Sequence, residues 1–208
     1  MHLKPAIETV SGSEFNYLDA KDPLTRICAF DIATGLSNTC RFAGQMTQFY
    51  SVAQHCVYAV QVAQMIPSAM GSILLEQIAL LHDASEAYMQ DIPSPLKQLL
   101  PDYQRLQHQV EQRIYHYYGL DKHLANWTRE MRTIDLCLLK TEQLALRGPC
   151  DWDLLKNVDR LNVAIEPWSP TVAKAAWLQE FRRLFPNEPF GPEEFLGGDR
   201  YRKLDVVG

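Results

Sequence analysis

Stretches of helical apolar periodicity, each closed by proline or glycine, constrain the fold of this chain more than any other feature of its sequence. Between about 49 and 66, Val52, Cys56 and Ala59 recur at spacings of three and four residues, which places them on one face of a helix. The same period returns in later segments that stop at proline or glycine, residues at which helices commonly end. We expect helices over about 49–66, 72–89, 102–118, 121–127, 129–147 and 170–185.

The two ends of the chain differ from this helical middle. Residues 6–19 alternate weakly around Ser11-Gly12-Ser13, a pattern that predicts a small hairpin, and residues 20–48 are irregular apart from a helix-like stretch near 29–36. The stretch 186–208 is rich in Pro and Gly, and we expect it to be loosely packed. The sequence therefore predicts an all-α helical bundle at 49–185, with an N-terminal part at 1–48 packed on it and a tail at 186–208.

Composition excludes several classes of protein. The 208 residues are 47% apolar and 22% charged, which is typical of a globular protein and ample for a buried core. The formal charge of −5 disfavours binding to nucleic acid polymers, which requires concentrated Lys and Arg. We expect no membrane association, because no segment approaches the roughly 20 apolar residues of a spanning helix. The N-terminus lacks the apolar core of a signal peptide, and the five cysteines include no C-x-x-C pair, so we expect reduced thiols in the cytoplasm.

Two polar residues at the end of an apolar helix suggest a metal site. His82 and Asp83 follow directly after four apolar residues, and burying an ionised carboxylate is costly unless a cation or hydrogen-bond donors compensate it. Histidine nitrogen and aspartate oxygen are ordinary ligands for Zn, Mn, Fe or Co. Glu86 lies one helical turn further on, and the proline-rich turn can fold Asp91 back toward it. Alternatively, Asp83 pairs with an arginine of a neighbouring helix.

Further ligands must come from other helices. His55 lies near the apolar side of the segment 49–66, and Asp135 is an acid within a run of apolar residues. Both are natural supplements to His82 and Asp83. The alternatives are that His55 is a core histidine with satisfied hydrogen bonds and that Asp135 is solvated or paired with Arg132.

Two basic residues are candidates for a phosphate contact. Arg41 lies between Cys40 and Phe42 in a non-helical stretch, where a guanidinium can grip a phosphate with two parallel hydrogen bonds. Lys97 follows the proline-rich turn and can contribute a second positive charge. Either residue can equally be an ordinary solvated side chain.

These residues, taken together, resemble a known family. The order His55, His82-Asp83, Asp135 is similar to the H…HD…D signature of the HD-domain phosphohydrolases. The segment HDASEAYMQDIPSPLK (82–97) resembles the corresponding stretch of bacterial HD-domain 5′-deoxynucleotidases, and SNTCRFAGQMTQFYSVAQHC (37–56) extends the likeness to their prophage and phage relatives. The resemblance covers residues 6 to about 185 and implies an HD-domain helical bundle.

The resemblance assigns roles to the candidate residues. It implies one divalent metal ion (Co, Mn, Zn, Fe or Mg), with the ligands His55, His82, Asp83 and Asp135. It implies that Glu86 is the acid/base residue, that Asp91 assists it, and that Arg41 lies near the position of the family's phosphate-binding arginine. The deoxynucleotidases carry Trp after that arginine, whereas this chain has Phe42, a position that the resemblance places near the sugar and base.

The expected activity is hydrolysis of deoxynucleoside 5′-monophosphates to deoxynucleoside and phosphate. A first rival is a triphosphohydrolase of the dATP type, which would need extra basic side chains for the additional phosphates. A second rival is a non-catalytic helical binding protein with a vestigial site. Because relatives are homo-oligomers, we expect a dimer or a larger assembly that takes a nucleotide as its substrate.

Overall fold

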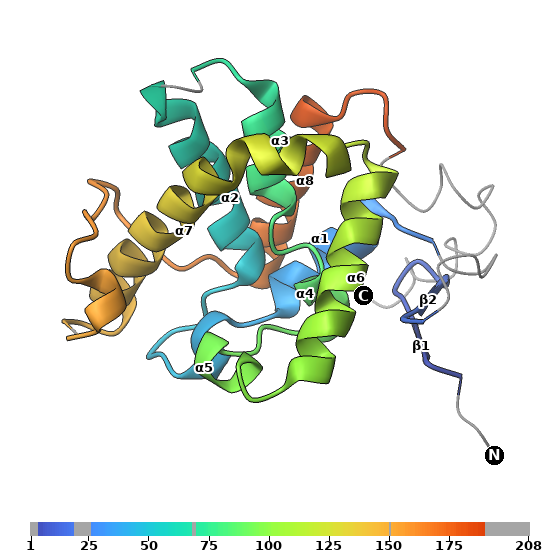
Figure 1. Cartoon of the computed structure of the whole chain (residues 1–208), viewed down its shortest axis with the longest axis horizontal. Helices are drawn as coiled ribbons and strands as arrows, with labels where there is room; N and C mark the ends of the chain where they lie inside the picture. The colour runs from blue at the N-terminus through green and yellow to red at the C-terminus, as the bar shows by residue number, and fades with distance from the viewer. Residues whose placement is uncertain (1–3, 19–25, 68–69, 150, 190–208) are drawn as a thin grey trace, which may run out of the picture.

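A computed structural model describes residues 4–18, 26–67, 70–149 and 151–189, and it confirms the all-α class with a small N-terminal sheet (Figure 1). The strands are β1 (Ala6–Glu8) and β2 (Glu14–Asn16). The α-helices are α1 (Ala29–Asn38), α2 (Val52–Met65), α3 (Ile73–Leu81), α4 (Glu86–Met89), α5 (Ser94–Lys97), α6 (Pro101–Tyr117), α7 (Leu124–Leu146) and α8 (Pro170–Leu184). Among the described residues, short 3₁₀ segments include η1 (Arg41–Gly44), η3 (Asp121–His123) and η4 (Asp153–Leu155).

Helix α2 is the central element of the bundle. It packs against α3, α7 and α8, and Figure 1 shows α7 crossing over it. Its residues are buried on nearly every side, as expected of a helix that is apolar almost all round. Ser51 caps its first turn by accepting a hydrogen bond from the backbone N–H of Gln54 at 3.1 Å. His55 therefore enters the core one turn after a well-defined helix start.

The ends of the long helices follow the expected signals. Helix α6 begins at Pro101, and the turn after it contains Gly119 at φ +69°, a left-handed conformation that glycine adopts without strain. Helix α8 begins at Pro170, and the hydroxyl of Ser169 accepts from the N–H of Val172 at 3.3 Å. The division predicted between 121–127 and 129–147 is wrong: α7 runs unbroken from Leu124, since no proline or glycine interrupts it.

The helix predicted over 72–89 is also wrong in one respect, because α3 ends at Leu81. From there the backbone tightens into successive three-residue turns, in which Ala84 N–H donates to Leu81 and Glu86 N–H donates to Asp83. A short helix, α4, then begins at Glu86. In such turns, side chains three residues apart lie nearly in line, so Asp83 and Glu86 are brought to the same side of the chain.

The N-terminal hairpin packs on α4 and α6. Its strands pair antiparallel, with Ile7 opposite Phe15, and Figure 1 shows it at the edge of the molecule. The ring of Phe15 stacks on Tyr88 of α4 at 3.9 Å between centroids, and the Tyr17 hydroxyl donates to the Tyr88 carbonyl at 2.6 Å. Arg113 of α6 donates to the backbone carbonyl of Asn16 at 2.8 Å. The hairpin is thus joined to the elements that follow α3.

Helix α1 approaches α4 at a glycine. A Cβ atom added to Gly35 would lie 2.4 Å from the carbonyl oxygen of Ala87. That distance is far inside van der Waals contact with backbone, so the two helices can approach this closely only if residue 35 is glycine. The contact fixes the position of α4, the helix that begins at Glu86.

The expected tail is described only as far as residue 189, so its remainder, 190–208, lies outside the described residues. Across the described ranges, no helix combines the length and the apolar character that a bilayer crossing requires.

Candidate metal centre

Two histidines from different helices face one another in the core. His55, in the second turn of α2, is fully buried, and His82 caps the C-terminus of α3. Their Nε2 atoms lie 3.1 Å apart. The two side chains that sequence reasoning combined from separate helices are therefore adjacent in space.

Hydrogen bonds to the other ring nitrogen define the state of both imidazoles. His55 Nδ1 lies 2.7 Å from Glu142 Oε1, and His82 Nδ1 lies 2.8 Å from the carbonyl oxygen of Ala79. A carbonyl or carboxylate oxygen accepts, so both Nδ1 atoms donate. In neutral imidazoles, both Nε2 atoms would then present lone pairs to each other. A divalent cation is the group that satisfies two facing imidazole lone pairs, with the Nδ1–H groups fixing the rings.

Two carboxylates complete the group. Asp83 Oδ2 lies 3.2 Å from His82 Nε2 and 3.7 Å from His55 Nε2. Asp135, on α7, places Oδ1 3.4 Å from His55 Nε2. The ligand atoms of His55, His82 and Asp135 lie within 4.8 Å of one another, as do those of Cys56, His82 and Asp83. Groups of histidine, aspartate and cysteine are therefore close enough to hold a metal ion.

The carboxylates of the group are partly buried and lie among positive charges. Burial opposes ionisation of Asp83, but His82 and the other neighbouring cations hold the pKa of that carboxyl well below its usual range. Burial also opposes ionisation of Asp135, although 47% of its side chain is exposed, and its hydrogen bond to His55 lowers its pKa. Burial lowers the pKa of His82, yet the adjacent Asp83 outweighs it, so the net pKa is well above the usual value. In the absence of a metal, the ionised carboxylates therefore favour protonated histidines.

Glu142 is a member of this site that sequence reasoning missed. It is fully buried on α7, accepts from His55 and from the hydroxyl of Tyr50 at 2.8 Å, and lies near Arg41. It follows Asp135 by seven residues, which is two helical turns and hence the same face of α7. An acid at that spacing in a helix with buried positions was the signal that could have indicated it.

Arg41 lies at the entrance of the charged group, with its side chain nearly buried. Its backbone is fixed beside the start of α2, where Arg41 N–H donates to the Tyr50 carbonyl at 2.9 Å. Its guanidinium contacts Asp83 Oδ2 at 3.4 Å and Glu142 Oε2 at 3.2 Å. Burial opposes its charge, but Glu142 and Asp83 raise its pKa further above the normal value. Asp83 therefore contacts an arginine and also belongs to the candidate metal ligands, so both interpretations of this residue apply at the same site.

The contact between Arg41 and Glu142 leaves polar atoms unsatisfied. Its alignment is poor for a hydrogen bond, and neither Arg41 Nε nor Glu142 Oε2 has a hydrogen-bond partner among the described residues. Glu86 Oε2 is a third such buried atom. Buried polar atoms without partners are rare in proteins and commonly mark a functional site.

Glu86 and Lys97 form an ion pair in the wall of the cavity beside the candidate metal ligands. Lys97 Nζ, at the end of α5, donates to Glu86 Oε1 at 3.1 Å. Burial and the nearby Asp83 and Asp91 raise the pKa of Glu86 well above its usual value, against the opposing effect of Lys97. Burial also raises the pKa of Asp91. Burial therefore favours the protonated form of both acids.

These residues share one cavity of about 780 Å³. Its lining includes the following predicted site residues: Arg41, Phe42, Asp83, Glu86, Asp91, Lys97 and Asp135. His55 and His82 lie behind the carboxylates. The segment that follows α7 contributes Trp152 to the wall. A volume of this size suits a ligand as large as a small organic molecule.

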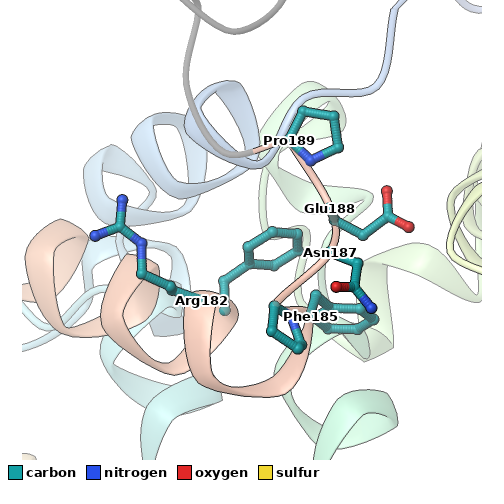
Figure 2. Close-up of a pocket in the computed structure, with 7 residues that line it drawn as sticks. Arg182, Phe185, Asn187, Glu188 and Pro189 are labelled. Atoms are coloured by element: carbon teal, nitrogen blue, oxygen red, sulfur yellow. The ribbon is translucent and has the colours of Figure 1, made fainter.

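A second hollow, of about 500 Å³, lies at the end of α8 (Figure 2). It is lined by Phe181, Phe185 and the turn that follows, and Figure 2 shows Arg182 and Glu188 extending to opposite sides. Its described lining holds no histidine, aspartate or cysteine. Glu188 is the one carboxylate of that described lining, so the hollow lacks the cluster of ligand groups found beside the first cavity.

Fold and site define the chain as an all-α protein with a partly buried group of histidines and carboxylates beside a cavity, whose ligand atoms are close enough together to hold a metal ion. The chain is 38% identical over 183 residues to the "Uncharacterized protein YfdR" of Escherichia coli (strain K12), which covers 86% of this chain and 94% of the relative. The chain belongs to the family of YfdR. No family model matches it.

Proposed function

We propose that the chain is a metal-dependent HD-domain phosphohydrolase that converts deoxynucleoside 5′-monophosphates to deoxynucleosides and phosphate. One observation carries the proposal: His55 and His82 direct Nε2 atoms at each other, 3.1 Å apart, while both Nδ1 atoms donate elsewhere. Asp83 and Asp135 lie beside them in the order that resembles the HD signature.

The donor set favours one divalent transition metal. Two imidazole nitrogens and two carboxylate oxygens suit Mn, Fe, Co or Zn better than Mg, which prefers oxygen ligands. When bound, such an ion would supply Lewis acidity toward a phosphoryl oxygen and acidify water at neutral pH. The His55–Glu142 hydrogen bond supports this use, because carboxylates commonly orient metal-binding histidines in this way.

Arg41 would bind the phosphoryl group. Its guanidinium is held at the cavity wall beside Asp83, and neighbouring acids keep it charged. It can offer two parallel N–H groups to phosphoryl oxygens, and its charge would offset the charge that develops there. Lys97 lies in the same lining and adds a second cation.

Glu86 would manage the proton, with assistance from Asp91. Its raised pKa favours the protonated form, and this proton can be donated to the ester oxygen of the leaving deoxynucleoside. The carboxylate that remains is stabilised by Lys97 at 3.1 Å. Asp91 lines the same cavity and would relay or share that proton.

The charge of the cavity favours a monophosphate over a triphosphate. The described lining holds two basic residues, Arg41 and Lys97, and Lys97 is already paired with Glu86. The acids of the lining outnumber them: Asp83, Glu86, Asp91, Glu111, Asp135, Asp151 and Asp153. The additional negative charges of a triphosphate would face these acids, and a nearby cation, Arg147, already contacts the rings of Phe42 and Trp152.

We further propose a cytoplasmic homo-oligomer of at least two copies. The resemblance to oligomeric HD-domain deoxynucleotidases supports the assembly, and cysteines without a C-x-x-C pair support a reducing compartment. Light scattering coupled to gel filtration gives the number of copies, and a monomer would contradict the proposed assembly.

The function is tested with purified protein that is stripped of metal and reloaded with Mn, Co or Zn. Phosphate release from each deoxynucleoside monophosphate, and triphosphate release from each deoxynucleoside triphosphate, are measured for the wild type and for His82→Ala. His116→Ala is the matched control, because His116 is an exposed histidine on α6 that pairs with Asp121.

We expect metal-dependent phosphate release by the wild type and His116→Ala, and none by His82→Ala. Triphosphate as the sole product would replace the monophosphatase assignment with the triphosphohydrolase. A protein that retains no metal and hydrolyses no nucleotide would be the non-catalytic binding protein.

A further inference from the structure

A series of stacked contacts runs along the cavity wall away from Arg41. The Arg41 guanidinium carbon lies 5.6 Å from the centroid of the Phe42 ring, and the Arg147 guanidinium carbon lies 5.5 Å from the same ring. Arg147 lies in turn 5.7 Å from the ring of Trp152. One ring and one guanidinium therefore separate Arg41 from Trp152. Phe42 and Trp152 both line the large cavity.

The backbone at the start of this series is strained. Phe42 and Ala43 both adopt left-handed conformations, with φ +56° and φ +51°. Two successive non-glycine residues in this region cost about 1–3 kcal/mol each, and such strain persists mainly where function depends on it. The turn allows adjacent residues to point differently: Arg41 is nearly buried beside Asp83, whereas Phe42 stays partly exposed beside Arg147.

The far end of the series is exposed but anchored. Trp152 keeps 39% of its surface exposed, although a large aromatic ring gains by burial. The loop that carries it is fixed by Leu155, which is buried and whose carbonyl accepts from Lys140 of α7 at 2.9 Å. Arg147 is itself positioned by its contact with Gln143 at 3.3 Å. The indole is thus held in place with a large part of its surface uncovered.

The cavity wall combines charged and apolar side chains. Arg41 and the carboxylates contribute charge, and Trp152, Leu154 and Leu139 contribute apolar surface, with Asp151 and Asp153 on either side of Trp152 in the sequence. A ligand that contacts both Arg41 and Trp152 carries an anionic group joined to a flat apolar one. Nucleobases stack on aromatic side chains through their faces, whichever base is present.

We infer that Trp152, positioned by Arg147, is the stacking platform for the nucleobase while Arg41 holds the phosphate. The inference rests on the proposed function, since it assigns the base-binding part of that same site. It makes Trp152 a substrate-binding residue contributed by the loop after α7, and it predicts a broad choice of base because stacking alone does not read hydrogen bonds.

The test separates the base from the phosphate. Binding of deoxyadenosine 5′-monophosphate and of deoxyribose 5-phosphate, which lacks a base, is measured by calorimetry on metal-free protein. The hydrolysis of both compounds is then followed with metal-loaded protein. The variants are Trp152→Ala and Trp152→Phe, with Tyr117→Ala as the control, because Tyr117 is also an exposed aromatic but does not line the cavity.

We expect Trp152→Ala to weaken binding of the nucleotide and to raise its KM by about tenfold, which is typical of the loss of one base–aromatic stack. Deoxyribose 5-phosphate should be unaffected, Trp152→Phe should recover most of the binding, and Tyr117→Ala should behave as the wild type. Equal effects on both compounds, or no effect on either, would overturn the inference.

Failure of the proposed function gives a different result. A wild type that binds the nucleotide and loses it on Trp152→Ala, without hydrolysing anything, would refute the phosphohydrolase and keep the stacking platform. A wild type that binds neither compound would refute both. If Trp152→Ala instead dissociates an oligomer, with equal losses for both compounds, the exposed indole is a contact between copies and the inference is wrong.

Discussion

The large cavity and the hollow at the end of α8 are built from different kinds of side chain. Beside the large cavity, the buried acids Glu142 and Glu86 each leave a polar atom without a hydrogen-bond partner in the described structure. The hollow at the end of α8 is lined by aromatic rings, with Phe181 stacked between Trp177 and Phe185 at 5.5 Å and 4.8 Å. Aromatic packing stabilises the fold by itself, whereas a buried acid with an unsatisfied polar atom destabilises it. This difference favours the large cavity as the candidate functional site.

Removing a histidine of the charged hollow should have the largest effect. We expect His82→Ala to lose the metal and to reduce phosphohydrolase activity by more than about 100-fold, beyond the effect typical of residues that only support a ligand. The measurements are metal content by mass spectrometry and phosphate release. Retention of one metal ion per chain by this variant would show that His82 is not needed for metal binding, and the proposed difference between the two hollows would be wrong.

Removing a ring of the aromatic hollow should act on stability instead. Phe181 is fully buried, so Phe181→Ala should cost about 3–5 kcal/mol in the free energy of unfolding. Denaturant unfolding measures the loss, and metal content per folded chain should stay the same. The milder Phe181→Leu should lie between the two proteins. A selective loss of metal with unchanged stability would contradict this division of roles.

The role of Glu142 can be tested against a second buried glutamate, Glu76, which serves as the control. Glu142→Gln should weaken metal binding by about 10–100-fold, since the amide supports His55 less well than a carboxylate. Glu76 is also buried but pairs with Arg183 of α8, so Glu76→Gln should leave metal affinity unchanged. Competition with a fluorescent chelator gives both affinities. Equal affinities for the two variants would remove Glu142 from the site.

The smallest expected effect is a gain of stability at Glu86. Its raised pKa means that the folded state holds a proton that the unfolded state releases, so stability falls as the pH rises from the ordinary value of 4.5 through the raised one. Glu86→Gln removes that loss and should stabilise the metal-free protein at pH 7 by about 1 kcal/mol. The difference should vanish below pH 4.5, as followed by thermal unfolding. A variant less stable than the wild type at pH 7 would show that Glu86 supports the fold.

The sequence predicted the helices better than the junctions between them. The apolar period and the caps at Ser169 and Pro170 depend on neighbouring residues, so they can be recognised without tertiary contacts. The end of α3 at Leu81 depends on where His82 and Asp83 must point. That requirement comes from His55 and Arg41, which are distant in sequence. The apolar periodicity therefore predicts one helix over 72–89, whereas α3 ends at Leu81, where the candidate site begins.

The residues of the candidate site also differ in how far the sequence predicts them. The positions His55, His82, Asp83 and Asp135 were proposed from burial cost and a resemblance, and the structure brings them together. Glu142 escaped because its role is to support another side chain, and such a role has no local pattern. Trp152 is absent from the predicted site residues because nothing in the sequence relates it to Phe42; the connection passes through the guanidinium of Arg147.

The glycine contact between α1 and α4 makes the geometry of the site depend on parts of the chain outside the cavity, namely α1 and the N-terminal hairpin. Gly35 lets α1 lie against Ala87, one residue from Glu86, and the hairpin grips the same short helix through Phe15 and Tyr88. The hairpin and α1 therefore hold in place the short helix that carries Glu86, the proposed acid/base residue. We expect a fusion tag or truncation that disturbs these contacts to lower the proposed activity without altering a cavity-lining residue, so assays of this chain should begin with an intact N-terminus.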